Sequence, residues 1–221
     1  MESQPPQLVP IPPISKLRAS ERQQLLDDLN YLNTAEIKAF CKQHKIPYMI
    51  SIASADGRQR RTSEMDRKGI VLNRIRHFLS TGEILDETCF PAAVVASDAT
   101  PAKPTASNRL FYGHYDKKSA PMIALLKELT GGKFQSGAIA RILAREFWSR
   151  GIAPTFKEYA SAWLQAQQEH ERPNPEWAFL SDLARGTAAP DWKKLRAKKA
   201  ARVLARLKKI KWQLAIGRGQ E

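Results

Sequence analysis

The strongest constraint on the fold of this chain lies between residues 32 and 82, where apolar residues recur at helical spacing in two short stretches. Residues three or four apart share one face of an α-helix, so each stretch predicts an amphipathic helix. The apolar positions are Leu32, Ile37, Phe40, Cys41 and Ile46 in the first stretch and Val71, Leu72, Ile75, Phe78 and Leu79 in the second. We expect the two helices to share one small core and to leave the segment between them outside it.

The segment between these helices is basic and is predicted to be a loop. It carries Arg58, Arg60, Arg61, Arg67 and Lys68. The N-terminal end of the following helix offers free backbone N–H groups and the positive end of the helix dipole, and both favour an anion. Nucleic-acid phosphate is the anion expected here, because the whole chain has 36 Lys and Arg against 22 Asp and Glu.

These same residues resemble the SAP module, a helix–extended turn–helix unit that binds DNA. The matching positions are Leu32, Ile37 and Cys41 in the first helix, Ile46 at the start of the turn, and Lys68, Arg74 and Ile75 in the second helix. The resemblance implies that Lys68 and the loop arginines contact phosphate, and that Arg74 either contacts phosphate or braces the second helix. The turn is longer here than in the module, and Asp66 stands where the module has glycine. The alternative interpretation is an ordinary helical hairpin with a solvated charged face.

Most of the positive charge lies in residues 192–221, which hold eleven Lys and Arg against one acid and so supply +10 of the net +14. Trp192, Leu195, Val203, Leu207, Ile210 and Leu214 form an apolar stripe on a predicted helix capped by Asp191. The candidate nucleic-acid contacts around that stripe are Lys193, Lys194, Lys198, Lys199, Arg202, Arg206, Lys208 and Lys209. Three roles stay open for this helix: lying along nucleic acid, lying on an anionic membrane, or docking on a protein core.

The chain is predicted to be mostly all-α, with no confident strand, and to divide at a Pro-, Ala-, Ser- and Thr-rich stretch. The expected parts are a Pro-rich extended arm at 1–13, a SAP-like helical domain at 14–90, a linker at 91–108, a second helical domain at 109–170, and a short helix with a basic amphipathic helix at 171–221. The second domain resembles an uncharacterised bacterial helical domain that follows SAP-like modules.

Short motifs predict where the helices begin and end. The predicted starts are Ser20 with Gln23, Asn33 with Glu36, Ser119 with Pro121, Thr155 with Glu158, and Asn174 with Pro175, and the predicted stops are Gly82, Gly131–Gly132, Gly151 and Gly186. Phe147, Trp148, Phe156, Tyr159 and Trp163 fall at helical spacing and are predicted to pack in a core rather than to stack on bases.

The sequence shows no catalytic or metal-binding constellation, so we expect no enzyme activity and no cofactor. The four histidines lie far apart, the chain has only two cysteines, and His114 with Asp116 is a single pair in a loop. Neither a signal-peptide pattern nor an apolar stretch of membrane-spanning length is present, so a cytoplasmic location without membrane contact is expected.

Together these features predict a non-enzymatic protein that binds duplex DNA through its backbone, in a regulatory or architectural role. One alternative is an RNA- or ribosome-associated protein. Another is an interaction subunit of a bacterial regulatory or defence assembly, which would dock on a protein through the Pro-rich arm or the C-terminal helix. A nuclease without a recognisable motif is the enzymatic alternative.

Overall fold

The computed structural model describes the backbone of residues 8–10, 12–170, 189–210 and 214–216. These residues form two compact units, each with its own apolar core. Unit 1 takes its described residues from 8–48, 65–87 and 189–216, and unit 2 takes them from 49–64 and 88–170. The chain therefore leaves unit 1 to form two strands of unit 2 and returns to unit 1 for one helix. It then leaves for the rest of unit 2 and comes back to unit 1 with residues 189–216.

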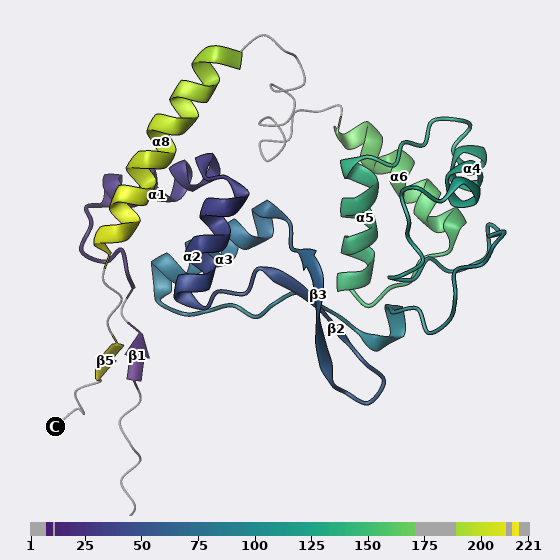
Figure 1. The fold of residues 1–221 in the computed structure, drawn as a ribbon, viewed down its shortest axis with the longest axis horizontal. Helices are drawn as coiled ribbons and strands as arrows, with labels where there is room; N and C mark the ends of the chain where they lie inside the picture. Colours follow the sequence, from purple (N-terminus) through teal and green to yellow (C-terminus); the bar gives the residue numbers. More distant parts are fainter. Residues whose placement is uncertain (1–7, 11, 171–188, 211–213, 217–221) are drawn as a thin grey trace, which may run out of the picture. The chain divides into compact units, whose positions relative to one another are not determined.

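Unit 1 is built from helices contributed by three separate stretches of sequence (Figure 1). Its elements are β1 (Leu8–Pro10), α1 (Ala19–Asp28), the 3₁₀ helix η1 (Leu29–Tyr31), α2 (Thr34–His44), α3 (Lys68–Thr81), α8 (Ala189–Lys209) and β5 (Leu214–Ile216). Strands β1 and β5 pair in antiparallel orientation. The expected extended arm thus includes a short strand over residues 8–10.

The core of unit 1 confirms the two apolar patterns and adds α8 to them. All ten apolar residues of those patterns are buried in one cluster, together with Leu25 and Leu29. Ala200, Val203 and Leu207 of α8 belong to the same cluster. Burying a side chain such as Val or Leu contributes about 1.5–3 kcal/mol, so α8 is part of the folded core of unit 1.

The described residues of unit 2 form a small sheet, one 3₁₀ helix and three α-helices. Its elements are β2 (Met49–Ala53), β3 (Gln59–Met65), which ends at the first residue of unit 1, β4 (Cys89–Phe90), the 3₁₀ helix η2 (Ala92–Val94), α4 (Ala120–Leu129), α5 (Ala138–Ser149) and α6 (Phe156–His170). The strand order is β3-β2-β4, with β2 and β4 parallel, so β3 lies at an edge of the sheet. Ile50 and Ile52 of β2 point into the core of this unit.

The aromatic residues of unit 2 pack in its core, as their spacing predicts. Trp148, Phe156, Tyr159 and Trp163 are buried there, and Phe147 packs against them partly buried. The Trp148 indole N–H donates to the Leu110 carbonyl oxygen at 2.9 Å, and the Tyr159 hydroxyl donates to the Ala140 carbonyl oxygen at 2.5 Å. These rings are therefore unavailable as a base-stacking platform.

The prediction of a mostly helical chain is confirmed, but the expectation that strands are absent is wrong. Residues 49–65 form the β2–β3 hairpin instead of a loop (Figure 1). The backbone of β2 forms hydrogen bonds on both sides, with β3 and with β4. The stretch 91–108, expected to be a linker, lies within unit 2, where Val94 is fully buried. It is held by backbone hydrogen bonds such as Tyr112 N–H to the Val94 carbonyl oxygen at 2.8 Å.

Most predicted helix ends agree with the structure, and two starts are different. Helix α8 begins at Ala189, so Asp191 lies within its first turn and does not cap it. Asn33 and Glu36 form a reciprocal cap, Ser119 accepts from the Met122 N–H, and Gly82 ends α3 in the left-handed region. The helix expected to start at Ser20 with Gln23 instead has Arg18 as its N-cap, whose N–H donates to the Glu21 carboxylate at 3.1 Å. Gln23 donates to Asp27 instead. The predicted helix from Asn174 to Gly186 lies outside the described residues.

Candidate nucleic-acid interface

The basic residues of α8 fall into two rows, and the inner row is occupied by the protein's own acceptors. Arg196 donates to the Glu36 carboxylate at 2.7 Å and to the Tyr31 carbonyl oxygen at 2.9 Å. Lys199 and Arg202 both reach the buried carboxylate of Asp28, at 3.3 and 2.5 Å. Arg206 donates to the Gln24 side chain at 3.2 Å. This row stabilises α8 against α1, η1 and α2.

Lys199 of the inner row also contacts the side chain of Tyr31 in η1. Its ammonium lies 4.3 Å from the centre of the Tyr31 ring and donates to the Tyr31 hydroxyl at 3.2 Å. That hydrogen bond, together with the nearby Asp28 carboxylate, raises the pKa of Lys199. Lys199 and Arg202 therefore stabilise the fold, and their positive charges are already partly neutralised by the Asp28 carboxylate.

The outer row of α8 consists of lysines without such acceptors. Lys194, Lys198, Lys208 and Lys209 are exposed, and none of them makes a hydrogen bond or ion pair with another described residue. Residues 192–210 contain no Asp or Glu, so the helix offers no internal partner. At 1.5 Å per residue the row spans about 22 Å along the helix. The side chain of Lys193 lies outside the described part of the chain.

The second group of exposed cations lies on the β2–β3 hairpin of unit 2. Arg60 and Arg61 are exposed in β3 and have no partner among the described side chains. At the turn, the Arg58 guanidinium lies 3.5 Å from the Asp56 carboxylate, and the main-chain N–H of Arg58 also donates to that carboxylate. Both of these side chains are largely exposed, so the pairing is weak.

The base of this hairpin is fixed to the body of unit 2. Glu64 near the end of β3 forms an ion pair with Arg145 of α5. The Thr62 hydroxyl donates to the Ile50 carbonyl oxygen at 2.8 Å. The exposed arginines therefore extend from a strand that is held in place at its other end.

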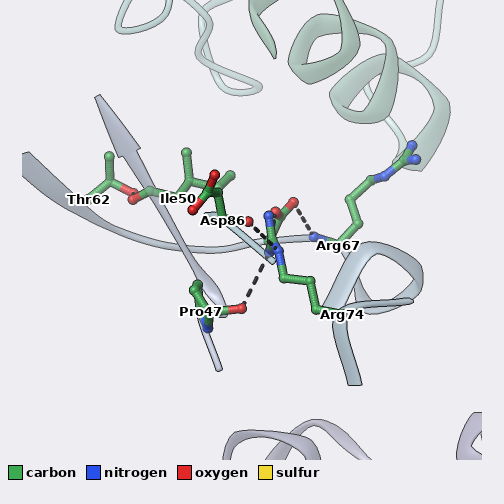
Figure 2. A network of polar contacts seen from close by, with 7 residues as sticks. Pro47, Ile50, Thr62, Arg67, Arg74 and Asp86 are labelled. Atoms are coloured by element: carbon green, nitrogen blue, oxygen red, sulfur yellow. Dashed lines mark hydrogen bonds and ion pairs between the residues drawn. The ribbon is translucent and has the colours of Figure 1, made fainter. Parts of the chain in front are cut away.

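Arg74 is buried and braces the fold, which is the second of the two roles expected for it. Its guanidinium donates to the Asp66 carboxylate at 3.0 Å and to the Asp86 carbonyl oxygen at 2.9 Å, and lies 3.4 Å from the Pro47 carbonyl oxygen (Figure 2). The two charged side chains are only 6% and 2% exposed. The carboxylate that replaces the expected glycine is thus the partner of Arg74, and this arginine cannot reach a phosphate.

Lys68 and Arg67, at the start of α3, are also engaged within the protein. The Lys68 ammonium donates to the Asn30 carbonyl oxygen at 2.6 Å. Burial, and then the charge of Arg196, lower the pKa of Lys68, and Glu36 opposes this effect. Arg67 is half-buried, and its main-chain N–H donates to the Asp66 carboxylate at 2.8 Å. The start of α3 is therefore not the open cationic site that the sequence predicts.

Other candidate chemistries find little support among the described residues. His114 is buried, with Nε2 3.2 Å from the Asp98 carbonyl oxygen, and the Asp116 carboxylate accepts from the Lys118 N–H instead. No group of three or more His, Cys, Asp or Glu side chains is placed to hold a metal ion within this part of the chain. None of the described helices has the length and apolar composition needed to cross a bilayer.

The sequence did not predict which acidic side chains pair with the basic residues. Asp28 and Glu36 pair with cations of α8, more than 150 residues away, and Asp66 pairs with Arg74, eight residues away. Arg196 belongs to the inner row, although its role was not predicted. The only available signal was the 3.6-residue period of α8, which places Arg196 and Lys199 beside Val203. Comparisons with protein-family models, curated proteins and solved structures find no match for this chain.

Proposed function

We propose that this protein is a non-enzymatic nucleic-acid-binding protein that contacts the backbone of duplex DNA. The outer row of α8 (Lys194, Lys198, Lys208 and Lys209) is the main contact, and Arg60 and Arg61 of the hairpin are a second one. The likeness of residues 32–82 to a SAP module points to the same ligand, although Lys68 and Arg74 are engaged internally.

The observation that carries the proposal is the separation of charge on α8. Acidic residues of α1 and α2 pair with Arg196, Lys199 and Arg202 of its inner row, while its outer row is left with four exposed lysines. Lysines that only stabilised the fold would have acceptors nearby. An exposed row of like charges is instead unfavourable until a polyanion neutralises it, and duplex DNA carries one charge per about 1.7 Å.

The salt dependence of binding gives the first test. Each neutralised phosphate contributes about −0.9 to the slope of log affinity against log salt for B-DNA. Contacts from the four lysines and two arginines therefore predict a slope of about −5. Fluorescence anisotropy on a 20-base-pair duplex, a matching RNA duplex and single strands, at several salt concentrations, measures this slope. A slope near −1 would contradict the proposal, and tighter binding to the RNA duplex would favour the RNA-associated alternative.

Charge reversal locates the contact better than truncation, because removing α8 would also remove Val203 and Leu207 from the core. The variant Lys194→Glu/Lys198→Glu/Lys208→Glu/Lys209→Glu should lower duplex affinity by at least about 100-fold and reduce the slope by about 3–4. The control carries the same charge change on exposed lysines of unit 2: Lys117, Lys118, Lys127 and Lys133, all changed to Glu.

The control should retain most of the affinity if the contact is local to α8. Equal loss in both variants would mean that net charge, rather than the outer row, determines binding. Thermal melting should show both variants folded, since the reversed lysines of α8 have no ion-pair partner among the described residues. Incubating DNA with the protein and Mg²⁺ or Mn²⁺ tests the nuclease alternative, and strand cleavage would contradict the non-enzymatic assignment.

A further inference from the structure

The edge strand β3 has two faces of different chemistry. Successive side chains of a strand point to opposite faces. Thr62 and Glu64 share the face that is bonded to Ile50 and Arg145 of unit 2. The alternating residues Gln59, Arg61 and Ser63 are all exposed. The outward face of β3 therefore presents a row of hydrogen-bonding side chains to solvent, anchored through the opposite face of the same strand.

The residue types in this row suit base edges better than phosphates. Both cationic and neutral polar side chains can contact phosphate, but in the major groove Gln forms two hydrogen bonds with adenine and Arg forms two with guanine. Side chains two apart on a strand are separated by about 6.7 Å, close to two base-pair steps of about 3.4 Å each. The major groove of B-DNA admits a two-stranded β-ribbon.

We infer that the β2–β3 hairpin enters the major groove of B-form DNA and gives the protein a sequence preference. In this arrangement Arg61 contacts guanine instead of phosphate and Gln59 contacts adenine, two base pairs apart, while α8 and Arg60 contact the phosphate backbone. This inference rests on the proposed function and adds the element that discriminates between sequences. An RNA duplex is a poor ligand for the hairpin, because the A-form major groove is deep and narrow.

Arg60 provides a matched control within the same strand. It is exposed like Arg61 and carries the same charge, but strand alternation places it on the face shared with Thr62 and Glu64. Replacing either arginine removes one positive charge from the hairpin. Only the replacement of Arg61 should remove contacts with base edges.

The test is selection of bound duplexes from a random 20-base-pair DNA pool, followed by anisotropy on the enriched duplex and on duplexes with one base pair changed. The full-length protein should enrich a guanine-containing site and bind it about 5- to 150-fold more tightly than a duplex with that guanine pair replaced. Arg61→Ala should lose this ratio. Arg60→Ala should keep the ratio and weaken binding to all duplexes alike.

The outcomes separate this inference from the proposed function. Salt-dependent duplex binding without any enriched sequence would overturn the groove contact and leave the α8 backbone contact standing. An equal loss of preference in Arg60→Ala and Arg61→Ala, or a preference that survives Arg61→Ala, would also overturn it. Absence of duplex binding in the unchanged protein would remove both proposals. Circular dichroism on each variant establishes that the exposed substitutions leave the fold intact.

Discussion

Arg74 and Arg61 show two opposite uses of the same side chain. Arg74 is buried beside Asp66 and donates to backbone carbonyl oxygens as well, so its charge is fully used within unit 1. Arg61 lies exposed on the edge strand β3, with no partner among the described side chains. The comparison shows that the 36 lysines and arginines of the chain overstate the number of cations available to a polyanion, because some of them, like Arg74, are paired with the protein's own acidic groups. The chemically useful charge is the part that its own acidic groups leave unmatched.

The largest effect expected from this comparison is on stability. Arg74→Met should lower the free energy of unfolding by about 3–5 kcal/mol, because it leaves Asp66 buried without its partner. Arg61→Met should change it by less than about 0.5 kcal/mol, since an exposed side chain is lost. Urea denaturation of both variants measures the difference. The double variant Arg74→Met/Asp66→Leu should recover much of the loss, and similar values for the two single variants would contradict the assigned roles.

A smaller effect is expected at the inner row of α8. Asp28→Asn should destabilise unit 1 by about 1–3 kcal/mol, because the carboxylate that holds Lys199 and Arg202 becomes neutral. Asp27→Asn is the neighbouring control, since Asp27 is exposed and its carboxylate accepts only from the Gln23 side chain in the described structure. Chemical denaturation compares the two. If Asp28→Asn were as stable as the control, the inner row would not hold the helix.

The smallest effect separates a structural cation from a binding one. Lys68→Met should leave the slope of duplex affinity against salt unchanged, because Lys68 donates to Asn30 within unit 1. Lys198→Met should make that slope less steep by about 0.9, the value of one phosphate contact. Anisotropy titrations at four or more salt concentrations resolve this difference. A reduced slope in Lys68→Met would restore the start of α3 as a phosphate site.

Features encoded over a few neighbouring residues were predictable from the sequence. The cap formed by Asn33 and Glu36, the start of α4 at Ser119 and the end of α3 at Gly82 depend on side chains within one turn of helix. Only part of the predicted apolar stripe of α8 is confirmed. Val203 and Leu207 are buried, as the helical period predicts, whereas Leu195 is exposed and Leu214 lies in β5.

Features that depend on distant partners were not predictable. Strand β3 has the sequence QRRTSEM, which lacks the apolar alternation of a half-buried strand because it lies at a sheet edge. Arg74 and Asp66 lie only eight residues apart, but the buried site of this pair also includes the carbonyl oxygens of Pro47 and Asp86, which are 27 and 12 residues from Arg74. The division of the α8 cations likewise depends on Asp28 and Glu36, which lie more than 150 residues away.

The discontinuous sequence of unit 1 has a consequence for its biosynthesis. Leu25 and Leu29 share a core with Val203 and Leu207, yet all of unit 2 up to residue 170 is translated in between. At about 5–20 residues per second, the ribosome needs roughly 6–24 s to add the ~120 residues between the end of α3 and the last core residue of α8. During that interval α8 does not yet cover the apolar face of α1 and η1. The nascent chain is therefore expected to be most prone to aggregation, and most dependent on chaperones, shortly before α8 emerges.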